Sequence, residues 1–208
     1  MDLIEQTREH LLRTLENGCE ETKNVPYRYE HSLRVAAVGR EIARAEGFDE
    51  EAMVLACLLH DIGYARCRTP EEYSRHGALS ADMAREWLTE NSYDPEQTET
   101  ICYGILAHTE HPEKLPRPCT PFEDTVGDAD NIDRFDALRM VDTLAYFDLM
   151  QKRPAEILEL CRRQIGHYEG YKTMTLGTRT AEVLWRDRLS YQIEFYRRLE
   201  RQMEQTAL

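Results

Sequence analysis

The stretch EEAMVLACLLHDIG, residues 50–63, decides the fold. Its centre holds eight successive apolar residues, Ala52 to Leu59, and such a run predicts a helix that is buried on most of its sides. Asp49 comes directly before the run as a good N-cap, and acidic residues fill the first turn. A helix of this kind needs other helices around it, so the stretch predicts the centre of a bundle.

The same helix ends in two polar residues, His60 and Asp61. A carboxylate at the end of an apolar helix is costly unless something pairs with it. A divalent cation is the strongest available partner, and imidazole nitrogen together with carboxylate oxygen suits Fe, Mn, Co, Ni or Zn. The plainer interpretation, in which His60 is satisfied in the core and Asp61 caps the next turn, would be favoured for an isolated His-Asp pair.

Helical spacing extends along nearly the whole chain, and no convincing strand pattern or internal repeat appears. We expect a helix that ends before Asn17-Gly18, a second from about Tyr27 to Glu46, a polar loop after Asp61, and a proline-rich loop over 109–121. Further helices are expected over about 74–91, 94–108, 122–131, 134–151, 155–168 and 179–204. The sequence therefore predicts an all-α bundle, a single domain over residues 1–208 with helices 152–208 packed on it.

Composition narrows the class of partner. The chain has 208 residues, and 26 Lys and Arg stand against 39 Asp and Glu, a formal net charge of −13. This charge disfavours broad nucleic-acid binding, although a local cation can still attract a small phosphate ester. No apolar stretch is long enough for a membrane span, and the N-terminus lacks a secretory signal. We therefore expect a cytoplasmic protein without nucleic-acid or membrane partners.

The cysteines are expected to be reduced thiols, because none forms a CxxC pair and no export signal is present. They are Cys19, Cys57, Cys67, Cys102, Cys119 and Cys161.

Other residues extend the His60-Asp61 pair. His31 lies near the start of the second helix, on its inward face. If the second helix and the central helix pack antiparallel, His31 meets His60 and Asp61. Three acids, Asp128, Asp130 and Asp133, follow in one short semi-apolar segment, and spacing alone does not choose among them.

The order of these residues resembles a known signature. His31 in HSLRVA (residues 31–36), His60-Asp61 in LLHDIG (58–63) and Asp130 in ADNI (129–132) are similar to the H…HD…D blocks of the HD-domain superfamily. The resemblance covers about residues 25–150. It implies an HD-domain helical bundle in which these four residues hold a first metal ion. Members of that superfamily are mostly phosphohydrolases and phosphodiesterases that act on nucleotides or related phosphate esters.

Two more histidines extend the resemblance. His76 opens a predicted helix and His108 closes one, and both resemble the extra ligands of the two-metal branch, which includes dinucleoside tetraphosphate hydrolases. In that branch Asp61 would bridge the two metals. The alternative is a pair of solvent-exposed histidines at helix ends. His111 is a substitute for His108, although Pro112 indicates that the helix has already ended.

The cationic groups depart from the family pattern. Many HD phosphohydrolases carry lysine soon after the HD-x-G block, where this chain has Tyr64. Arg134, one helical turn after Asp130, is our first candidate for a catalytic and phosphate-binding cation. Asp133 could orient water or Arg134, or could cap a following helix. Further cation candidates, each of which could instead be solvated, are Arg34, Arg66, Arg68 and Arg75.

The resemblance implies metal-dependent hydrolysis of a phosphate ester or anhydride, for which we expect a nucleotide substrate. One or two divalent transition metal ions would activate water, with Asp61, Arg134 and Asp133 as catalytic residues and Arg134, Arg66 and Arg75 at the substrate. Two alternatives use the same ligands: a non-catalytic ligand sensor that keeps a metal for structure, and a di-iron oxygenase of the myo-inositol oxygenase type. The substrate, the native metal and the oligomeric state are not readable from the sequence.

Overall fold

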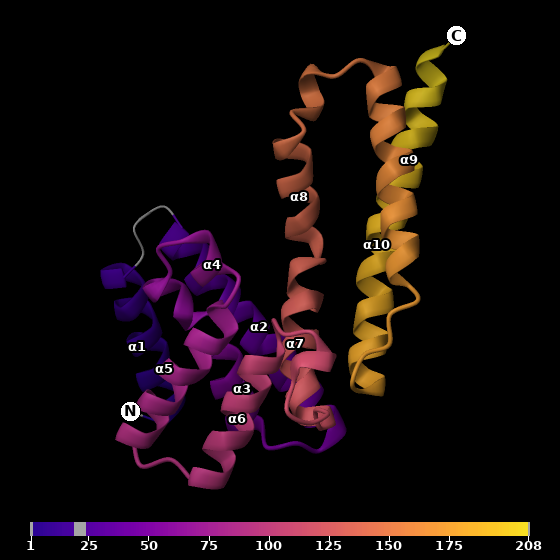
Figure 1. The fold of residues 1–208 in the computed structure, drawn as a ribbon. Coiled ribbons are helices and arrows are strands. Elements are labelled where there is room, and N and C mark those ends of the chain that lie inside the picture. The colour runs from indigo at the N-terminus through magenta and orange to yellow at the C-terminus, as the bar shows by residue number, and fades with distance from the viewer. Residues whose placement is uncertain (1, 19–23, 208) are drawn as a thin grey trace. The chain divides into compact units, whose positions relative to one another are not determined.

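The computed structural model describes residues 2–18 and 24–207, and this part of the chain is built from helices and turns without a strand (Figure 1). The all-α fold is therefore confirmed. The longer helices are α1 (Leu3–Gly18), α2 (Asn24–Glu46), α3 (Glu50–Leu59), α5 (His76–Glu90), α6 (Pro95–Ala107), α7 (Pro121–Arg134), α8 (Ala137–Tyr146), α9 (Pro154–Tyr171) and α10 (Arg179–Glu204). The shorter ones are η1 (Ile62–Arg66), α4 (Pro70–Tyr73), η2 (Pro112–Lys114), η3 (Leu149–Gln151) and η4 (Gln205–Ala207).

The chain divides into two compact units. Unit 1 comprises Met1–Asp133 together with Leu176–Ala181, and unit 2 comprises Arg134–Thr175 together with Glu182–Leu208. Unit 2 thus begins at Arg134, earlier in the chain than the C-terminal helices predicted over 152–208. The packing of residues 152–208 on the rest of a single domain stays a prediction.

Helix α3 is the centre of unit 1. Its eight apolar residues, Ala52 to Leu59, are all buried, and the helix is in contact with α1, α2, α5 and α6. Asp49 caps the helix, because its side chain accepts the N–H of Ala52 at 2.9 Å. Burial of the whole run stabilises this unit, at about 1.5–3 kcal/mol for each large apolar side chain.

Helices α2 and α3 form an antiparallel pair. The chain reverses at Gly47, which has a φ of 76° that only glycine adopts without strain. The N–H of Phe48 then donates to Ala43 O at 2.9 Å, which closes a Schellman-type end on α2. Gly39 lets the pair approach closely, since a Cβ there would lie 2.5 Å from Cys57 Sγ. The start of α2 is thereby brought beside the end of α3.

The segment after Asp61 was predicted to be a polar loop, and this prediction was wrong. It forms η1 and α4. Thr69 and Glu72 make a capping box at the start of α4, where Pro70 is the first helical residue. Residue 63 is a glycine for a steric reason: a Cβ there would lie 2.6 Å from both His76 O and Ser80 N. The close contact sets the first turn of α5 beside Asp61.

Unit 2 has its own aromatic core. Phe135 makes edge contacts with the rings of Tyr168, Tyr171 and Trp185, at 5.9, 5.1 and 4.8 Å between centroids. Figure 1 shows α9 and α10 side by side, and the Arg162–Glu200 and Arg197–Glu169 ion pairs join them.

The helix predicted over 134–151 is interrupted. Asp136 caps α8 by accepting the N–H of Ala137, and Asp148, with a left-handed φ of 46°, separates α8 from η3. By contrast, α10 has the predicted bounds of 179 and 204.

Two negative findings concern the described residues only. None of their helices has the length and apolar content needed to cross a bilayer. Their cysteines, Cys57, Cys67, Cys102, Cys119 and Cys161, are free thiols. Cys19 lies outside the described residues.

Candidate metal centre

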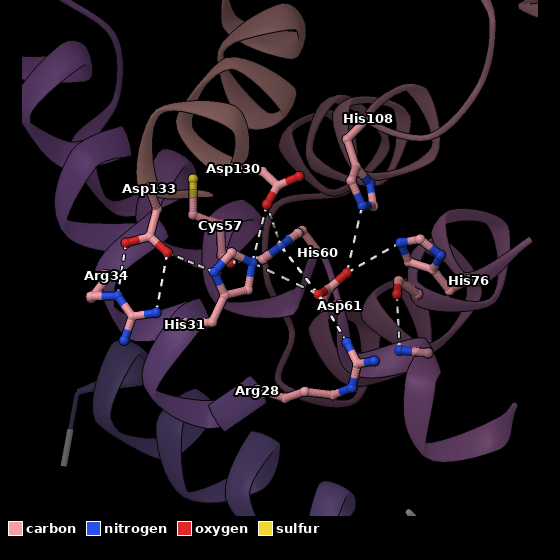
Figure 2. Close-up of polar contacts among 12 residues, drawn as sticks. Arg28, His31, Arg34, Cys57, His60, Asp61, His76, His108, Asp130 and Asp133 are labelled. Carbon is pink, nitrogen blue, oxygen red and sulfur yellow. Dashed lines mark hydrogen bonds and ion pairs between the residues drawn. The ribbon is translucent and has the colours of Figure 1, made fainter. Parts of the chain in front are cut away.

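Asp61 is the hub of the candidate site (Figure 2). It follows His60, the C-cap of α3, and it makes no capping hydrogen bond to η1, so the interpretation of Asp61 as a simple cap is not supported. Its side chain is buried, and its two oxygens face different partners. A buried carboxylate at this position needs compensating charge.

The Oδ2 atom of Asp61 faces a group that we call the first cluster, defined as His31, His60 and Asp130. The Nε2 atoms of His31 and His60 lie 3.9 and 3.6 Å from Oδ2. The same two nitrogens lie 3.1 and 3.9 Å from Asp130 Oδ1. One potential ligand atom from each residue of the cluster thus points to a common centre, and all three residues are buried.

The Oδ1 atom of Asp61 faces a second cluster, defined as His76 and His108. His76 Nε2 lies 3.3 Å and His108 Nε2 lies 3.7 Å from Oδ1. His76 is the first residue of α5 and His108 is the C-cap of α6, as the sequence predicted. The side chain of His108 is only 2% exposed, so it is not the solvated helix-end histidine of the alternative interpretation.

Three of the histidines are oriented in the same way. The Nδ1 atoms of His60, His76 and His108 face the carbonyl oxygens of Cys57, Tyr73 and Ile105, each three residues earlier. A carbonyl can only accept, so Nδ1 carries the proton and Nε2 keeps its lone pair in the neutral ring. Metal-binding histidines are commonly oriented by such a hydrogen bond on the opposite nitrogen.

The unpaired nitrogens test whether a metal fits here. Among the described residues, Nε2 of His60 and Nε2 of His108 are buried without a hydrogen-bond partner. A buried polar atom in that state costs free energy, and natural proteins seldom tolerate it. Since the unpaired lone pairs point to carboxylate oxygens, a cation between them would satisfy both. The donor set of imidazole nitrogen and carboxylate oxygen therefore fits a divalent transition metal.

The three candidate acids in the second half of α7 have three different partners, although all three are buried. Asp130 points to the first cluster. Asp128 accepts the N–H of Gly177 at 2.8 Å. Asp133 accepts from His31 Nδ1 at 2.7 Å and from both Nε and Nη2 of Arg34, at 2.8 and 3.2 Å. Asp133 lies in the last turn of α7 and orients His31, so it does not cap a following helix.

The electrostatics favour ionised acids at this centre. Burial alone would raise the pKa of Asp61, but His60, His108 and His76 hold it well below its usual range. Burial would lower the pKa of His31, yet hydrogen bonds to Asp130 and Asp133 raise it to about 9. Burial lowers the pKa of His60. Protons and a metal ion would compete for the same imidazole lone pairs, so metal binding would release protons.

The arginines lie differently from the sequence expectation. Arg34 is bound to Asp133, and Arg66 pairs with Glu86 at 2.9 Å on the surface. Arg75 is exposed just before α5. Arg134 is exposed and belongs to unit 2, so its role at the phosphate stays a prediction.

Sequence reasoning missed one cation. Arg28 Nη1 lies 3.6 Å from Asp61 Oδ2. Its signal was its spacing, because Arg28 comes one helical turn before His31 and shares its face of α2. The alternative ligand His111 is 65% exposed in the loop beyond α6 and does not join the centre.

Comparisons with known proteins agree with this geometry. Residues 28–138 match the family model described as the HD domain. A crystal structure of a predicted HD superfamily hydrolase from an uncultured Thermotogales bacterium is similar in fold, with a TM-score of 0.63 and 21% identity over 95% of this chain and 97% of that chain. No curated protein matches the chain.

Proposed function

Because the chain belongs to the HD domain family, a family that fits metal-dependent hydrolysis, we propose that it is a two-metal phosphohydrolase acting on a nucleotide or related phosphate ester. The single observation that carries the proposal is the placement of Asp61. Its Oδ2 faces His31, His60 and Asp130, and its Oδ1 faces His76 and His108. A carboxylate with imidazole nitrogens on both of its oxygens is suited to bridge two cations.

The protein side of the chemistry follows from this arrangement. When bound, divalent metal ions lower the pKa of coordinated water and neutralise charge on phosphoryl oxygens. The chain would hold them through His31, His60, Asp61 and Asp130 in one position, and through Asp61, His76 and His108 in the other. The Nδ1 hydrogen bonds fix the three ring orientations before any ligand arrives, so little reorganisation is needed.

The exposure of the histidines indicates the side from which a substrate reaches the centre. His60 is fully buried and the His108 side chain is 2% exposed, whereas the His76 side chain is 16% exposed. A phosphate ester would therefore reach the centre from the side of His76, where water and substrate have access. The surrounding apolar helices lower the local dielectric, which strengthens each charge interaction at the centre.

Phosphate esters suit the charge of this centre. The chain is acidic overall, so long polyanions are repelled, whereas a small ester meets the local positive field of bound cations. A nucleotide is the substrate that we propose, and the cytoplasm is where we expect the protein to act.

The test combines metal analysis with catalysis. Purified wild-type protein, His60→Ala and Asp61→Ala would be compared by elemental analysis and by phosphate release from a library of nucleotides and phosphate esters. We expect bound metal and phosphate release in the wild type, with near-complete loss of both in the two variants. Retention of metal or of phosphate release by either variant would contradict the proposal.

Two alternative functions give other outcomes with the same purified protein. A wild-type protein that holds its metals but turns over no phosphate ester would be a ligand sensor. Oxygen uptake together with a mixed-valent iron signal in electron paramagnetic resonance would indicate a di-iron oxygenase.

A further inference from the structure

Arg28 occupies a distinctive place beside the metal centre. Its guanidinium carbon lies 3.2 Å above the ring centroid of Tyr64, and its Nη1 lies 3.6 Å from Asp61 Oδ2. Figure 2 shows the side chain reaching from α2 toward Asp61. The contact with Asp61 is longer than a hydrogen bond, so it does not exhaust the five N–H donors of the guanidinium.

Tyr64 serves as a platform for this group. One neighbour of its ring is Arg28, and another is His76, whose ring is stacked on it at 4.3 Å with an interplanar angle of 23°. A cation over an aromatic face gains about 0.5–2 kcal/mol. The stack therefore restricts a long flexible side chain whose charged end lies beside Asp61.

The partial exposure of the Arg28 side chain also favours contact with a substrate. The side chain of Arg28 is 21% exposed, whereas His60 is fully buried. By comparison, the Arg34 guanidinium is engaged by Asp133, and Arg68 donates to the carbonyl oxygens of Ala65 and Cys67. Arg28 thus combines proximity to Asp61 with contact to solvent.

We propose that Arg28, held on the ring of Tyr64, binds the phosphoryl oxygens of the substrate; this inference rests on the proposed phosphohydrolase function. A guanidinium offers two parallel N–H groups that match two oxygens of a phosphate. Its position beside Asp61 would place those donors next to the oxygens that a bound metal also contacts. Tyr64 is a positioning residue in this arrangement, because it acts through Arg28.

The test uses inorganic phosphate as the ligand and the metal-loaded full chain. Isothermal titration calorimetry would compare phosphate affinity in the wild type, Arg28→Ala and Arg28→Lys, with metal content measured on the same samples. We expect Arg28→Ala to weaken phosphate binding about 10- to 100-fold, since a charged bidentate contact is lost. Arg28→Lys should recover only part of that loss, because lysine lacks the planar fork. Metal content should not fall, because the substitution removes a positive charge from the neighbourhood of Asp61.

Two controls isolate the effect. Arg85→Ala removes the same charge from an exposed arginine of α5 that pairs with Glu99 at 2.9 Å, and it should leave phosphate affinity unchanged. Tyr64→Leu removes the platform and should weaken phosphate binding several-fold, and the conservative Tyr64→Phe, which keeps the ring, should recover most of that loss.

The outcomes are distinct. Wild-type phosphate affinity in Arg28→Ala, an equal loss in Arg85→Ala, or loss of metal from Arg28→Ala would each overturn the assignment of Arg28. If the wild type binds phosphate through Arg28 but hydrolyses no phosphate ester, the proposed phosphohydrolase function fails while the phosphate site stands.

Discussion

The two clusters around Asp61 share a carboxylate but are built differently. The first cluster brings together three residues from α2, the end of α3 and α7, and all three are buried. The second cluster has two histidines, from the start of α5 and the end of α6, and the side chain of His76 is 16% exposed. His31 is oriented by the carboxylate of Asp133, whereas both histidines of the second cluster are oriented by backbone carbonyls of the preceding turn.

This difference predicts that the two positions bind metal with unequal affinities. The first would receive four protein ligands with Asp61 included, and a carboxylate behind His31 would raise the basicity of that ligand. The second would receive three protein ligands, which leaves coordination positions for water and phosphate. We therefore expect the first position to be the anchoring one and the second to be more open to exchange and chemistry.

The largest expected effect comes from removing one ligand of each cluster. In His60→Ala, the anchoring position is broken and we expect both metal equivalents to be lost, with phosphate release at background. In His76→Ala, we expect one equivalent to remain while phosphate release falls about 100-fold or more. Elemental analysis and phosphate release on the same preparations measure this. Equal metal content in the two variants would remove the distinction between the clusters.

The carboxylate behind His31 provides a sharper test of the first cluster. Asp133→Asn keeps the shape of the side chain but weakens its hydrogen bond to His31 Nδ1, so metal affinity should fall about 10- to 100-fold. Competition with a chelating indicator dye would measure the affinity.

Helix α7 supplies the matched control for this variant. Asp128 is also buried, but it accepts from the backbone of Gly177. Asp128→Asn should therefore reduce thermal stability and leave metal affinity unchanged. An equal loss of affinity in both variants would mean that the helix as a whole, and not the Asp133–His31 contact, supports the metal.

The part of the fold that follows from local pattern could be predicted from the sequence. The apolar run 52–59 predicted the buried centre, and the bounds of α10 were as expected. The break between α8 and η3 was missed because it depends on single residues, a cap at Asp136 and a left-handed Asp148, and not on hydrophobic period. The turn after Asp61 was missed because a capping box in a polar segment looks like loop composition.

The candidate site could be predicted from the sequence only in part. Family resemblance chose Asp130 among three acids that spacing could not separate. The partners of the other two are tertiary, since Asp128 meets Gly177 and Asp133 meets His31, far away in sequence. The spacing of Arg28 and His31 places both on one face of α2, but the contact of Arg28 with Tyr64 joins α2 to η1, and no local pattern encodes that pairing.

A backbone contact allows the second cluster to be disturbed alone. In Gly63→Ala, the new Cβ would lie 2.6 Å from His76 O and Ser80 N, so the start of α5 must move. We expect stability to fall by about 1–3 kcal/mol and the metal of the second cluster to be lost before that of the first. Urea unfolding and stepwise metal removal by a chelator measure the two effects. Simultaneous loss of both metals would contradict a separate second position.

Gly166 provides the control for that variant. A Cβ there meets nothing within 4 Å, so Gly166→Ala in α9 should be neutral or slightly stabilising, by about 0.5–1 kcal/mol, because alanine is the better helix former. Any loss of stability in this variant would show that glycine-to-alanine changes in this chain act through something other than contact with Cβ.

The smallest expected loss of stability concerns the start of α7, the helix that carries Asp130. Glu123 is buried there, accepts the N–H of Thr120 at 2.7 Å and pairs with Arg117. Although burial would raise its pKa, these contacts lower it. A lowered pKa contributes stability above the unfolded value of about 4.3, and this contribution is lost as pH falls through the folded value.

In metal-free protein, Glu123→Gln should therefore reduce the free energy of unfolding by about 1–2 kcal/mol at pH 7, with a smaller difference below pH 4. Urea unfolding at several pH values measures this, with Glu113→Gln as the control because that side chain is 88% exposed. Since the second cluster is carried by α5 and α6, the metal-loaded variant should keep its metal at the second position and bind somewhat more weakly at the first. A difference in stability that does not change with pH would mean that the charge of Glu123 is irrelevant and that only its packing supports α7.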